Sequence, residues 1–160
     1  MNCSRVGFGF DVHAFADNRE LWLGGIKIEH SSGLMGHSDA DVLIHAFCDA
    51  LLGAANLRDI GFHFPDTSGE YKNIDSKILL LETMLLVRAK GYELCNADCT
   101  ICAETPRLNP YIPDMQSCIA EVLGVDSDLI SIKATTTEKL GFVGRKEGIA
   151  AYVTLLIFKE

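Results

Sequence analysis

Hydrophobic residues alternate with small or polar residues near the start of the chain, over residues 5–13. Val6, Phe8, Phe10 and Val12 occupy every second position of this segment. Side chains on a β-strand point to opposite faces in turn, so a period of two is typical of a strand with one apolar face. We therefore predict a strand over residues 5–13.

Apolar runs of strand length predict further strands at residues 21–23, 26–28, 92–103, 129–134 and 149–158. Gly24 and Gly25 separate the first two of these runs and predict a hairpin. The run 149–158 is apolar on both alternating faces. Helices can cover one face of this strand, and a partner subunit is a natural cover for the other.

Three longer apolar segments carry helix start and stop signals, and they lie at residues 38–52, 75–90 and 110–123. Ser38 and Asp41 form an S-x-x-D pair that resembles a capping box at the start of the first segment. Asp75 is the predicted N-cap of the second segment, which is apolar nearly all round and should be heavily buried. Gly91 and Gly124 follow the second and third segments as stops.

The remaining segments are predicted loops at residues 30–36, 58–69 and 135–144, the last with room for one helical turn. Strands interleaved with three helices, without an internal repeat or a domain boundary, predict a single α+β domain over residues 1–160. In this domain we expect a sheet packed on three helices.

The formal net charge is −8 and Lys and Arg are scattered without a basic stripe, which argues against a nucleic-acid partner. The most apolar stretch, residues 78–87, is too short to cross a membrane and contains Glu82. The N-terminal segment lacks the apolar core and cleavage site of a signal peptide. We expect a cytoplasmic protein, or one in a plastid or apicoplast if a transit peptide has been removed.

Six cysteines in a chain without a secretion signal suggest free thiols in a reducing compartment. Cys95, Cys99 and Cys102 form C-x3-C-x2-C, a spacing that can hold three irons of a [4Fe–4S] cluster. The same residues lie in the predicted strand 92–103, where alternation puts Cys95 and Cys99 on one face and Cys102 on the other. We favour strand cysteines over a cluster.

Asp11 and His13 form a D-x-H pair on the first predicted strand, and their spacing puts both side chains on one face. With His45 on the first predicted helix, they would supply one carboxylate and two imidazoles. Three such ligands with an open fourth position are what catalytic zinc requires. The alternatives are two polar residues on an exposed strand face and a helix histidine whose hydrogen bonds are satisfied elsewhere.

Asp41, His45 and Asp49 are spaced i, i+4 and i+8, which makes one polar stripe on an otherwise apolar helix. A carboxylate beside a metal-binding imidazole could fix the orientation of that ring. A solvated helix face explains the same spacing, so both interpretations remain open.

Two further segments have the composition of phosphate sites. Residues 36–38, Gly-His-Ser, lead into the first helix, whose N-terminal N–H groups attract anions, although capping by Ser38 explains the same residues. Residues 135–142 contain three threonines followed by Glu138, which can hold a phosphate and a hard cation such as Mg²⁺. A Thr-capped helical turn is the alternative. An acidic protein that binds phosphates needs local positive charge, and a divalent metal is the usual source.

Together these segments resemble the 2-C-methyl-D-erythritol 2,4-cyclodiphosphate synthases of the non-mevalonate isoprenoid pathway. The similar stretches follow the order of the family almost end to end. They are GFGFDVHAF (7–15), GHSDADVLIHAFCDALLGAA (36–55), DIGFHFPD (59–66), KATTTEKLGFVGRKEGIAA (133–151) and, more loosely, ETPRLNPYIPDM (104–115).

The resemblance implies a homotrimer of α/β subunits with active sites at the subunit interfaces. It implies one Zn²⁺ per subunit, held by Asp11, His13 and His45. It also implies Mg²⁺ or Mn²⁺ on Glu138, between the phosphates of the substrate.

The resemblance further implies which residues contact the substrate. His37 and Thr136 match the positions that stabilise the transition state. The other implied contacts are His37 and Ser38 at the phosphates and methylerythritol; Asp59, Ile60 and Gly61 around the ribose; Phe64, Asp66 and Ser68 in the erythritol pocket; Ala103, Arg107, Leu108 and Asn109 around the cytosine of a neighbouring subunit's site; Thr135 and Thr136 at the diphosphate; and Thr137 in the same segment.

Phe10, Phe142 and Arg145 match a family cavity on the three-fold axis that can hold an isoprenoid diphosphate. The family often has an acidic residue near the position of Tyr152, where this chain has a phenol.

The activity implied by the resemblance is conversion of 4-diphosphocytidyl-2-C-methyl-D-erythritol 2-phosphate to the 2,4-cyclodiphosphate, with release of CMP. A zinc-dependent phosphohydrolase would use the same three ligands but would release two linear phosphates. A non-catalytic protein that binds an isoprenoid or a nucleotide is the other alternative, and it would keep its function after the metal ligands are removed.

Overall fold

The computed structural model of the chain describes residues 3–65, 69–71 and 73–159. Its elements in chain order are β1 (Cys3–Asp17), β2 (Leu21–Leu23), β3 (Ile26–Ile28), β4 (Ser32–Leu34), α1 (Val42–Ala54), α2 (Ile60–His63), η1 (Gly69–Tyr71), α3 (Ser76–Ala89), β5 (Glu93–Cys102), η2 (Asn109–Tyr111), α4 (Ile112–Leu123), η3 (Ser127–Leu129), β6 (Ile130–Thr135), α5 (Gly141–Gly144) and β7 (Gly148–Lys159).

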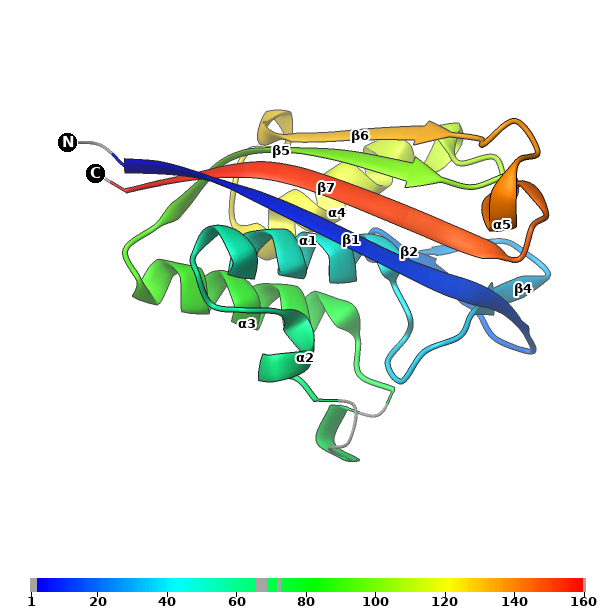
Figure 1. Ribbon diagram of the computed structural model, residues 1–160, viewed down its shortest axis with the longest axis horizontal. Coiled ribbons are helices and arrows are strands. Elements are labelled where there is room, and N and C mark those ends of the chain that lie inside the picture. The colour runs from blue at the N-terminus through cyan, green and yellow to red at the C-terminus, as the bar shows by residue number, and fades with distance from the viewer. Residues whose placement is uncertain (1–2, 66–68, 72, 160) are drawn as a thin grey trace.

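Within the described residues, the strands form a mixed five-stranded sheet in the order β4–β1–β7–β5–β6 and a separate β2–β3 hairpin. β1 runs antiparallel to β7 and β4, β7 runs antiparallel to β5, and β5 runs parallel to β6. The two ends of the chain lie side by side because Cys3 pairs with Lys159 (Figure 1). The predicted α+β fold, with a sheet packed on helices, is confirmed.

Helices α1, α3 and α4 cover one face of the sheet, and α1 lies directly against β1 and β7 (Figure 1). Glycines in β1 permit this approach. A Cβ atom at Gly9 would lie 1.9 Å from the carbonyl oxygen of Ala46, and one at Gly7 would lie 2.0 Å from that of Ala50. The absence of side chains here brings the helix that carries His45 against the strand that carries the other predicted metal ligands.

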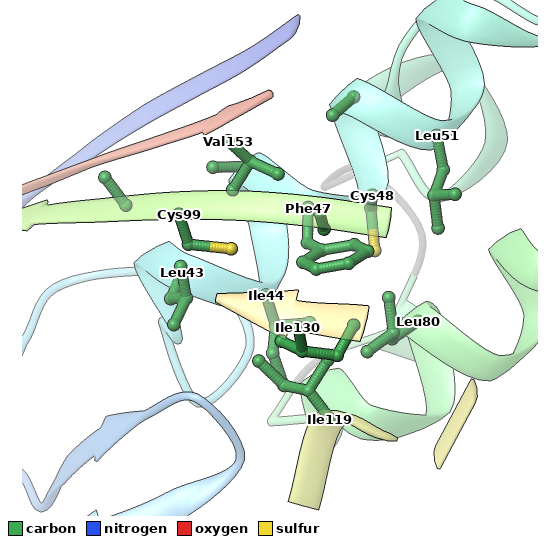
Figure 2. Packing of buried hydrophobic residues seen from close by; sticks show 14 of the residues in the cluster. Leu43, Ile44, Phe47, Cys48, Leu51, Leu80, Cys99, Ile119, Ile130 and Val153 are labelled. Atoms are coloured by element: carbon green, nitrogen blue, oxygen red, sulfur yellow. The ribbon is translucent and has the colours of Figure 1, made fainter. Parts of the chain in front are cut away.

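The hydrophobic core lies between α1 and the sheet, with α3 packed on α1 and α4 packed on β6 and α3 (Figure 2). Phe47 is the largest fully buried side chain and points into the centre of this layer. Around it pack Leu43, Ile44, Cys48, Leu51, Leu80, Cys99, Ile119, Ile130 and Val153. Each large apolar side chain buried in this way contributes about 1.5–3 kcal/mol of transfer free energy.

The other face of the sheet is apolar and has no cover from the described residues. Val6 and Phe8 on β1 are 69% and 62% exposed, and Phe10 and Val12 are also exposed. The ring of Phe10 packs against Tyr152 of β7 with 5.0 Å between centroids. The predicted alternation of β1 is therefore confirmed, and its outward side chains form an open apolar face.

The start of α1 differs from the prediction. The helix begins at Val42, and Asp41 is its N-cap, accepting a hydrogen bond from the backbone nitrogen of Ile44 at 3.0 Å. The S-x-x-D pair is not a capping box, because Ala40 has a left-handed φ of 60° and interrupts the helical path after Ser38. The helix also continues past its predicted end at residue 52, through Gly53 to Ala54.

Two predicted loops contain short regular elements. β4 lies in the loop predicted at residues 30–36 and pairs Leu34 with Phe15 of β1, which extends beyond its predicted end to Asp17. α2 lies in the loop predicted at residues 58–69. Both elements are too short to form alone and depend on contacts with distant parts of the chain.

The later elements follow the prediction with small shifts. Asp75 caps α3 as expected, and Gly124 ends α4 with a left-handed φ of 66°. The third helix starts with a 3-10 turn, η2, before α4. α5 is the single helical turn predicted in the loop at residues 135–144.

The prediction that the second helix is heavily buried is wrong for one side of α3. Leu80, Met84 and Val87 are buried, but Ile78 and Leu85 remain 49% and 48% exposed. Helices α1 and α4 cover only one side of this helix, and no described residue covers the other. Within the described residues, no helix combines the length and the apolar composition needed to cross a bilayer.

The cysteines of the C-x3-C-x2-C segment lie along β5. Cys99 faces the core, and burial raises the pKa of its thiol to about 12. The β5–β7 register shifts between Leu94 and Asn96, so Cys95 falls at a bulge. Cys102 is half-buried, and burial also raises the pKa of its thiol. Such protonated thiols behave as small apolar side chains.

Candidate active site

Asp11, His13 and His45 converge between β1 and α1. The Asp11 Oδ2 atom lies 2.9 Å from His13 Nε2 and 3.2 Å from His45 Nδ1. The two ring nitrogens lie 3.1 Å apart. Among the described residues, this is the one group of three acidic, histidine or cysteine side chains arranged to hold a metal ion.

The hydrogen bond made by His13 Nδ1 determines how the other ring nitrogen, Nε2, is presented to Asp11 and His45. His13 Nδ1 lies 2.6 Å from the carbonyl oxygen of Met35. A carbonyl oxygen only accepts, so Nδ1 carries the hydrogen and donates it. In the neutral ring, Nε2 then presents its lone pair toward Asp11 and His45. This arrangement is the one that metal-binding histidines commonly adopt.

The electrostatics of the group keep Asp11 ionised. Burial alone would raise the pKa of Asp11, but hydrogen bonds and attraction from His13 and His45 hold that pKa well below its usual range. Burial would lower the pKa of His13, but the hydrogen bond to Asp11 and the attraction of its charge raise it. At neutral pH the carboxylate is therefore available as an anionic ligand, and a proton on His13 competes with any cation.

The three side chains fit a tetrahedral zinc site. Ligand atoms about 2.0–2.1 Å from zinc lie about 3.3 Å from one another at the corners of a tetrahedron. The separations of 2.9–3.2 Å among Asp11, His13 and His45 are close to that value. A three-residue metal-binding group is thus present, with the chemistry that zinc prefers.

The polar stripe of α1 neither orients the His45 ring through a carboxylate nor forms a solvated helix face. Asp41 is fully buried and binds the backbone of Gly24 and Gly25, and Asp49 Oδ1 accepts a hydrogen bond from the backbone nitrogen of Ile60 at 2.8 Å. Neither carboxylate is a hydrogen-bond partner of His45, and the stripe is not a solvated face. Both carboxylates instead attach neighbouring segments to α1.

Asp49 joins the metal-binding group to the segment predicted to contact ribose. The pKa of Asp49 is raised, first by burial and then by the negative charges of Asp11 and Asp59. The hydrogen bond from Ile60 opposes this increase. The bond from Ile60 holds the first turn of α2 beside α1. The position of Asp59 and Gly61 relative to the metal group therefore depends on this carboxylate.

His37 and Ser38 lie in the turn before α1. The His37 carbonyl accepts a hydrogen bond from Asn73, and the buried Nε2 atom of its ring has no hydrogen-bond partner among the described residues. Ser38 is buried and its Oγ lies 3.1 Å from His45 Nε2, which links this turn to the metal group. Arg19 donates to the carbonyl oxygens of Gly36 and Ser38 and fixes the path of the turn.

The segment predicted to contact ribose and erythritol lies on and after α2. Asp59 caps α2, with its Oδ1 accepting from Phe62 at 3.0 Å, and Gly61 is exposed. The ring of Phe64 packs edge-on against Tyr71 with 5.6 Å between centroids. The predicted contacts Asp66 and Ser68 lie outside the described residues.

A cavity of about 330 Å³ brings together the two segments predicted to hold cytosine and diphosphate. It lies between the loop after β5 and the end of β6. Its lining residues are Ala103, Glu104, Pro106, Arg107, Leu108, Asn109, Ala134, Thr135 and Thr136. Four predicted cytosine contacts and two predicted phosphate contacts thus share one concave surface.

The turn after β6 exposes Thr136 and Glu138. Thr136 Oγ1 donates to Glu138 Oε1 at 3.2 Å, and Glu138 has a left-handed φ of 52°. Glu138 is exposed and is not a member of the three-residue metal group. The Thr137 hydroxyl donates to the carbonyl oxygen of Leu140 at 2.7 Å, so it is occupied within the turn.

Glu104 is a site residue that the sequence did not indicate. Its Oε1 accepts hydrogen bonds from the backbone nitrogens of Thr137 at 3.0 Å and Lys139 at 3.1 Å. The bond from Lys139 lowers the pKa of Glu104, desolvation opposes this shift, and the bonds from Thr137 lower the pKa further. This carboxylate therefore joins the cytosine loop to the threonine turn. A lone Glu in a loop has no pattern from which such a contact could be predicted.

The residues predicted to line an axial cavity lie on β1, on α5 and at the C-cap of α5. Phe142 is partly exposed on α5, and Arg145 pairs with Glu147 at 2.8 Å. Phe10 is on the open face of the sheet beside Tyr152.

The chain matches the YgbB family over residues 4–158. It is 73% identical over 153 residues to 2-C-methyl-D-erythritol 2,4-cyclodiphosphate synthase of Parabacteroides distasonis, covering 96% of this chain and 95% of that protein. It is 70% identical over 153 residues to the enzyme of the same name in Bacteroides fragilis, covering 96% of each chain.

Solved structures with the same fold include the bifunctional IspDF from Campylobacter jejuni, with a TM-score of 0.96 and 46% identity. That match covers all of this chain but 43% of the bifunctional protein. A CDP complex of IspF from Plasmodium falciparum matches with a TM-score of 0.87 and 32% identity, covering 100% of this chain and 99% of that one.

Proposed function

The chain belongs to the YgbB family of 2-C-methyl-D-erythritol 2,4-cyclodiphosphate synthases, and we propose that it converts 4-diphosphocytidyl-2-C-methyl-D-erythritol 2-phosphate to 2-C-methyl-D-erythritol 2,4-cyclodiphosphate and CMP. The protein is an enzyme, a lyase that forms a cyclic diphosphate. The observation that carries the proposed reaction is the convergence of Asp11, His13 and His45 in a chain that matches these synthases nearly end to end.

In the proposed reaction, an oxygen of the 2-phosphate attacks the β-phosphorus of the cytidine diphosphate arm. The bond from that phosphorus to the oxygen bridging it to the α-phosphate breaks, and CMP leaves with the bridging oxygen. The nucleophile is already ionised at neutral pH, so the step needs no general base. The barriers are repulsion between two anions and the entropy of closing an eight-membered ring. Holding both ends in line can supply roughly 7–11 kcal/mol in ideal cases.

The residues present fit the two cations that this chemistry calls for. Zinc held by Asp11, His13 and His45 would supply positive charge beside the phosphate oxygens. Mg²⁺ or Mn²⁺ held by the exposed carboxylate of Glu138 would neutralise the diphosphate.

His37 and Thr136 are proposed to stabilise charge on the phosphates in the transition state. The buried Nε2 atom of His37 has no partner among the described residues, and a phosphate oxygen would satisfy it. The hydroxyl of Thr136 is exposed beside Glu138, at the cavity that also contains the predicted cytosine loop. These side chains bind and position charge, and neither has to transfer a proton.

The cytidine part of the substrate is proposed to bind in the cavity formed by residues 103–109 and 134–136. The matching structure from Plasmodium falciparum contains CDP, which supports a nucleotide ligand for this fold. Leu108 and Ala103 give the cavity an apolar wall, while backbone groups and the hydroxyl of Thr135 give it polar positions. Such a mixture suits a planar base attached to a diphosphate.

We further propose a homotrimer with its active sites at the subunit interfaces. The open apolar face of β1 and β7, with Val6 and Phe8 the most exposed side chains, is unlike the surface of a stable monomer. Packing three such faces around an axis would bury them. It would also bring Phe10, Phe142 and Arg145 toward that axis, where apolar rings and a guanidinium suit an isoprenoid diphosphate.

The reaction is tested by incubating the purified protein with the proposed substrate and following the products by phosphorus NMR. We expect the resonances of a cyclic diphosphate together with CMP. Two linear phosphates would instead identify a zinc-dependent phosphohydrolase. Recovery of unchanged substrate by a zinc-loaded, trimeric protein would contradict the proposed activity.

Substitution of a metal ligand separates an enzyme from a binding protein. Asp11→Ala should abolish zinc binding and turnover while the oligomer persists, because the side chain lies at the edge of the core. A protein that keeps turnover without zinc would contradict the metal assignment. Unchanged nucleotide affinity and function in His13→Ala and His45→Ala would favour a non-catalytic binding protein.

A further inference from the structure

Ser76 lies at the first position of α3 and is fully buried between His45 and Asp39. Its Oγ atom lies 3.0 Å from His45 Nε2 and 2.5 Å from Asp39 Oδ1. Three polar side chains from separate segments therefore form a line that ends at a ring whose other nitrogen, Nδ1, faces Asp11 and His13.

The hydrogens available on Ser76 and Asp39 favour one direction of bonding at His45. A serine hydroxyl has a single hydrogen, and a carboxylate only accepts. Ser76 therefore donates its hydrogen to Asp39, which leaves its oxygen as an acceptor toward His45. A hydrogen on His45 Nε2 satisfies this oxygen, whereas a hydrogen on Nδ1 would leave two lone pairs facing each other across 3.0 Å. The Ser38 hydroxyl, 3.1 Å from the same Nε2, can also accept from it. In the Nε2–H form, the lone pair of the neutral ring is on Nδ1, the nitrogen that lies in the metal-binding group.

Asp39 is itself held in place by backbone donors. Its Oδ2 accepts from the backbone nitrogen of Ser76 at 2.9 Å, and its Oδ1 accepts from that of Asp41 at 3.1 Å. The carboxylate is thus attached both to the start of α3 and to the N-cap of α1. It cannot rotate away from the Ser76 hydroxyl without losing these bonds.

We propose that Asp39 and Ser76 are positioning residues that hold His45 as the Nε2–H tautomer, with Nδ1 ready to bind the metal. The inference rests on the metal site of the proposed function and assigns it a hydroxyl–carboxylate support that the sequence pattern did not reveal. Supports of this kind orient a ligating ring and typically contribute 10–100-fold to metal affinity.

A purely structural role for the same contacts is the main alternative. The bond from the Ser76 backbone to Asp39 Oδ2 would by itself attach the turn before α1 to α3. Ser76→Ala separates the two roles, because it removes the hydroxyl and keeps that backbone bond. Thr83→Val is a matched control, since Thr83 is fully buried on the same helix and makes no hydrogen bond to His45 or Asp39 among the described residues.

The first experiment measures zinc affinity by competition with a chromogenic chelator on wild type, Ser76→Ala and Thr83→Val. We expect Ser76→Ala to weaken zinc binding by about 10–100-fold and Thr83→Val to leave it within about threefold of wild type. Unfolding of the metal-free proteins is measured in parallel. Equal zinc affinity in Ser76→Ala and Thr83→Val overturns the proposal.

The second experiment reads the tautomer directly in the wild-type, metal-free protein. Nitrogen NMR of the imidazoles at mildly alkaline pH, where neutral rings dominate, distinguishes Nδ1–H from Nε2–H. We expect His45 to carry its hydrogen on Nε2 and Ser76→Ala to lose this preference. A wild-type His45 with its hydrogen on Nδ1 overturns the proposal even if Ser76→Ala does not fold.

These measurements can reject the inference about Ser76 independently of the proposed reaction. A wild type that forms the cyclic product, with the same zinc affinity in Ser76→Ala as in Thr83→Val, overturns this inference alone. A wild type that binds zinc but forms no cyclic product contradicts the proposed function, while the affinity and tautomer comparisons still decide the role of Ser76.

Discussion

The Oδ2 atom of Asp41 lies 2.7 Å from the backbone nitrogen of Gly25, at a fully buried position. The other carboxylate oxygen accepts from the backbone of Gly24 at 2.9 Å and of Ile44 at 3.0 Å. One side chain therefore caps α1 and attaches the β2–β3 hairpin to it. This arrangement makes Asp41 a determinant of stability, although it lies in a stretch that also contains metal-site residues.

Removing the Asp41 carboxylate should strongly destabilise the fold. Asp41→Ala leaves buried backbone donors without acceptors, at about 1–3 kcal/mol for each unsatisfied group. Asp41→Asn should cost less, because one oxygen remains, but its amide N–H groups would face the donor of Gly25 or Gly24. The free energy of unfolding from urea titration of metal-free protein measures both effects.

Asp75→Asn is the control for Asp41, because Asp75 caps α3 from a partly exposed position. Its cost should stay near 1 kcal/mol or below, as expected for a solvent-accessible cap. Equal losses of stability at Asp41 and Asp75 would show that burial of the carboxylate contributes nothing.

The close approach of α1 to β1 predicts opposite effects for two glycine substitutions. Gly9→Ala would place a Cβ 1.9 Å from the carbonyl oxygen of Ala46, so the helix must move, and we expect a loss of more than about 3 kcal/mol or failure to fold. Gly53→Ala meets no atom within 4 Å inside α1 and should stabilise by about 0.5–1 kcal/mol. Thermal unfolding of both variants is the measurement. An unchanged stability of Gly9→Ala would refute the close approach of Gly9 to the Ala46 carbonyl oxygen.

Glu104 should affect catalysis through the threonine turn that it holds. Glu104→Ala removes the acceptor for the backbone of Thr137 and Lys139, so Thr136 and Glu138 lose their fixed position. We expect kcat/KM to fall by about tenfold or more, since small misplacements of positioning groups are costly. Glu104→Gln keeps an oxygen acceptor and should stay within about threefold. Equal activity of Glu104→Ala and wild type would remove this role.

Glu138 is predicted to act on the diphosphate and not on zinc. Glu138→Ala should lower turnover by about 10²-fold or more while the zinc content stays unchanged, because its carboxylate is not part of the metal group of Asp11. Zinc is measured by atomic absorption and turnover by CMP release. Glu82→Gln, an exposed carboxylate on α3, is the control that should change neither. Loss of zinc from Glu138→Ala would contradict the separation of the two cation sites.

The open face of the sheet predicts where the oligomer forms. Phe8→Asp places a charge on the apolar face and should reduce the molar mass in solution from three chains to one, with loss of activity. Ile78→Asp introduces the same charge at an exposed apolar position of α3 on the helical side and should leave the trimer intact. Light scattering after gel filtration measures both. A trimeric Phe8→Asp would exclude this face as the interface.

The strand and helix assignments that the sequence predicted well are those that local physics determines. β1 follows the period of two from Val6 to Val12, and α4 ends at Gly124, which adopts the left-handed conformation that glycine tolerates. The D-x-H spacing put Asp11 and His13 on one face, as the structure confirms.

The assignments that failed depend on partners far away in the chain. Ser38 has the residue type and spacing of a cap, but its hydroxyl lies beside His45 and the backbone of Ala40, and Asp41 takes the capping position. β4 forms because β1 offers it an edge, and α3 exposes one apolar side because α1 and α4 cover only the other. Such choices are made by packing, which local propensity does not record.

The sequence by itself determined the kinds of side chain at the site and the family to which they point, since residue types and their order along the chain are local information. Only the tertiary structure decided which atoms meet: Nδ1 of His45 at the metal group, its Nε2 on Ser76, and Asp41 in the interior instead of on a solvated stripe. The contacts of His45 join β1, α1 and α3 across gaps of more than 30 residues. Their geometry follows from how closely the helix approaches the glycines of β1, which no spacing along the chain specifies.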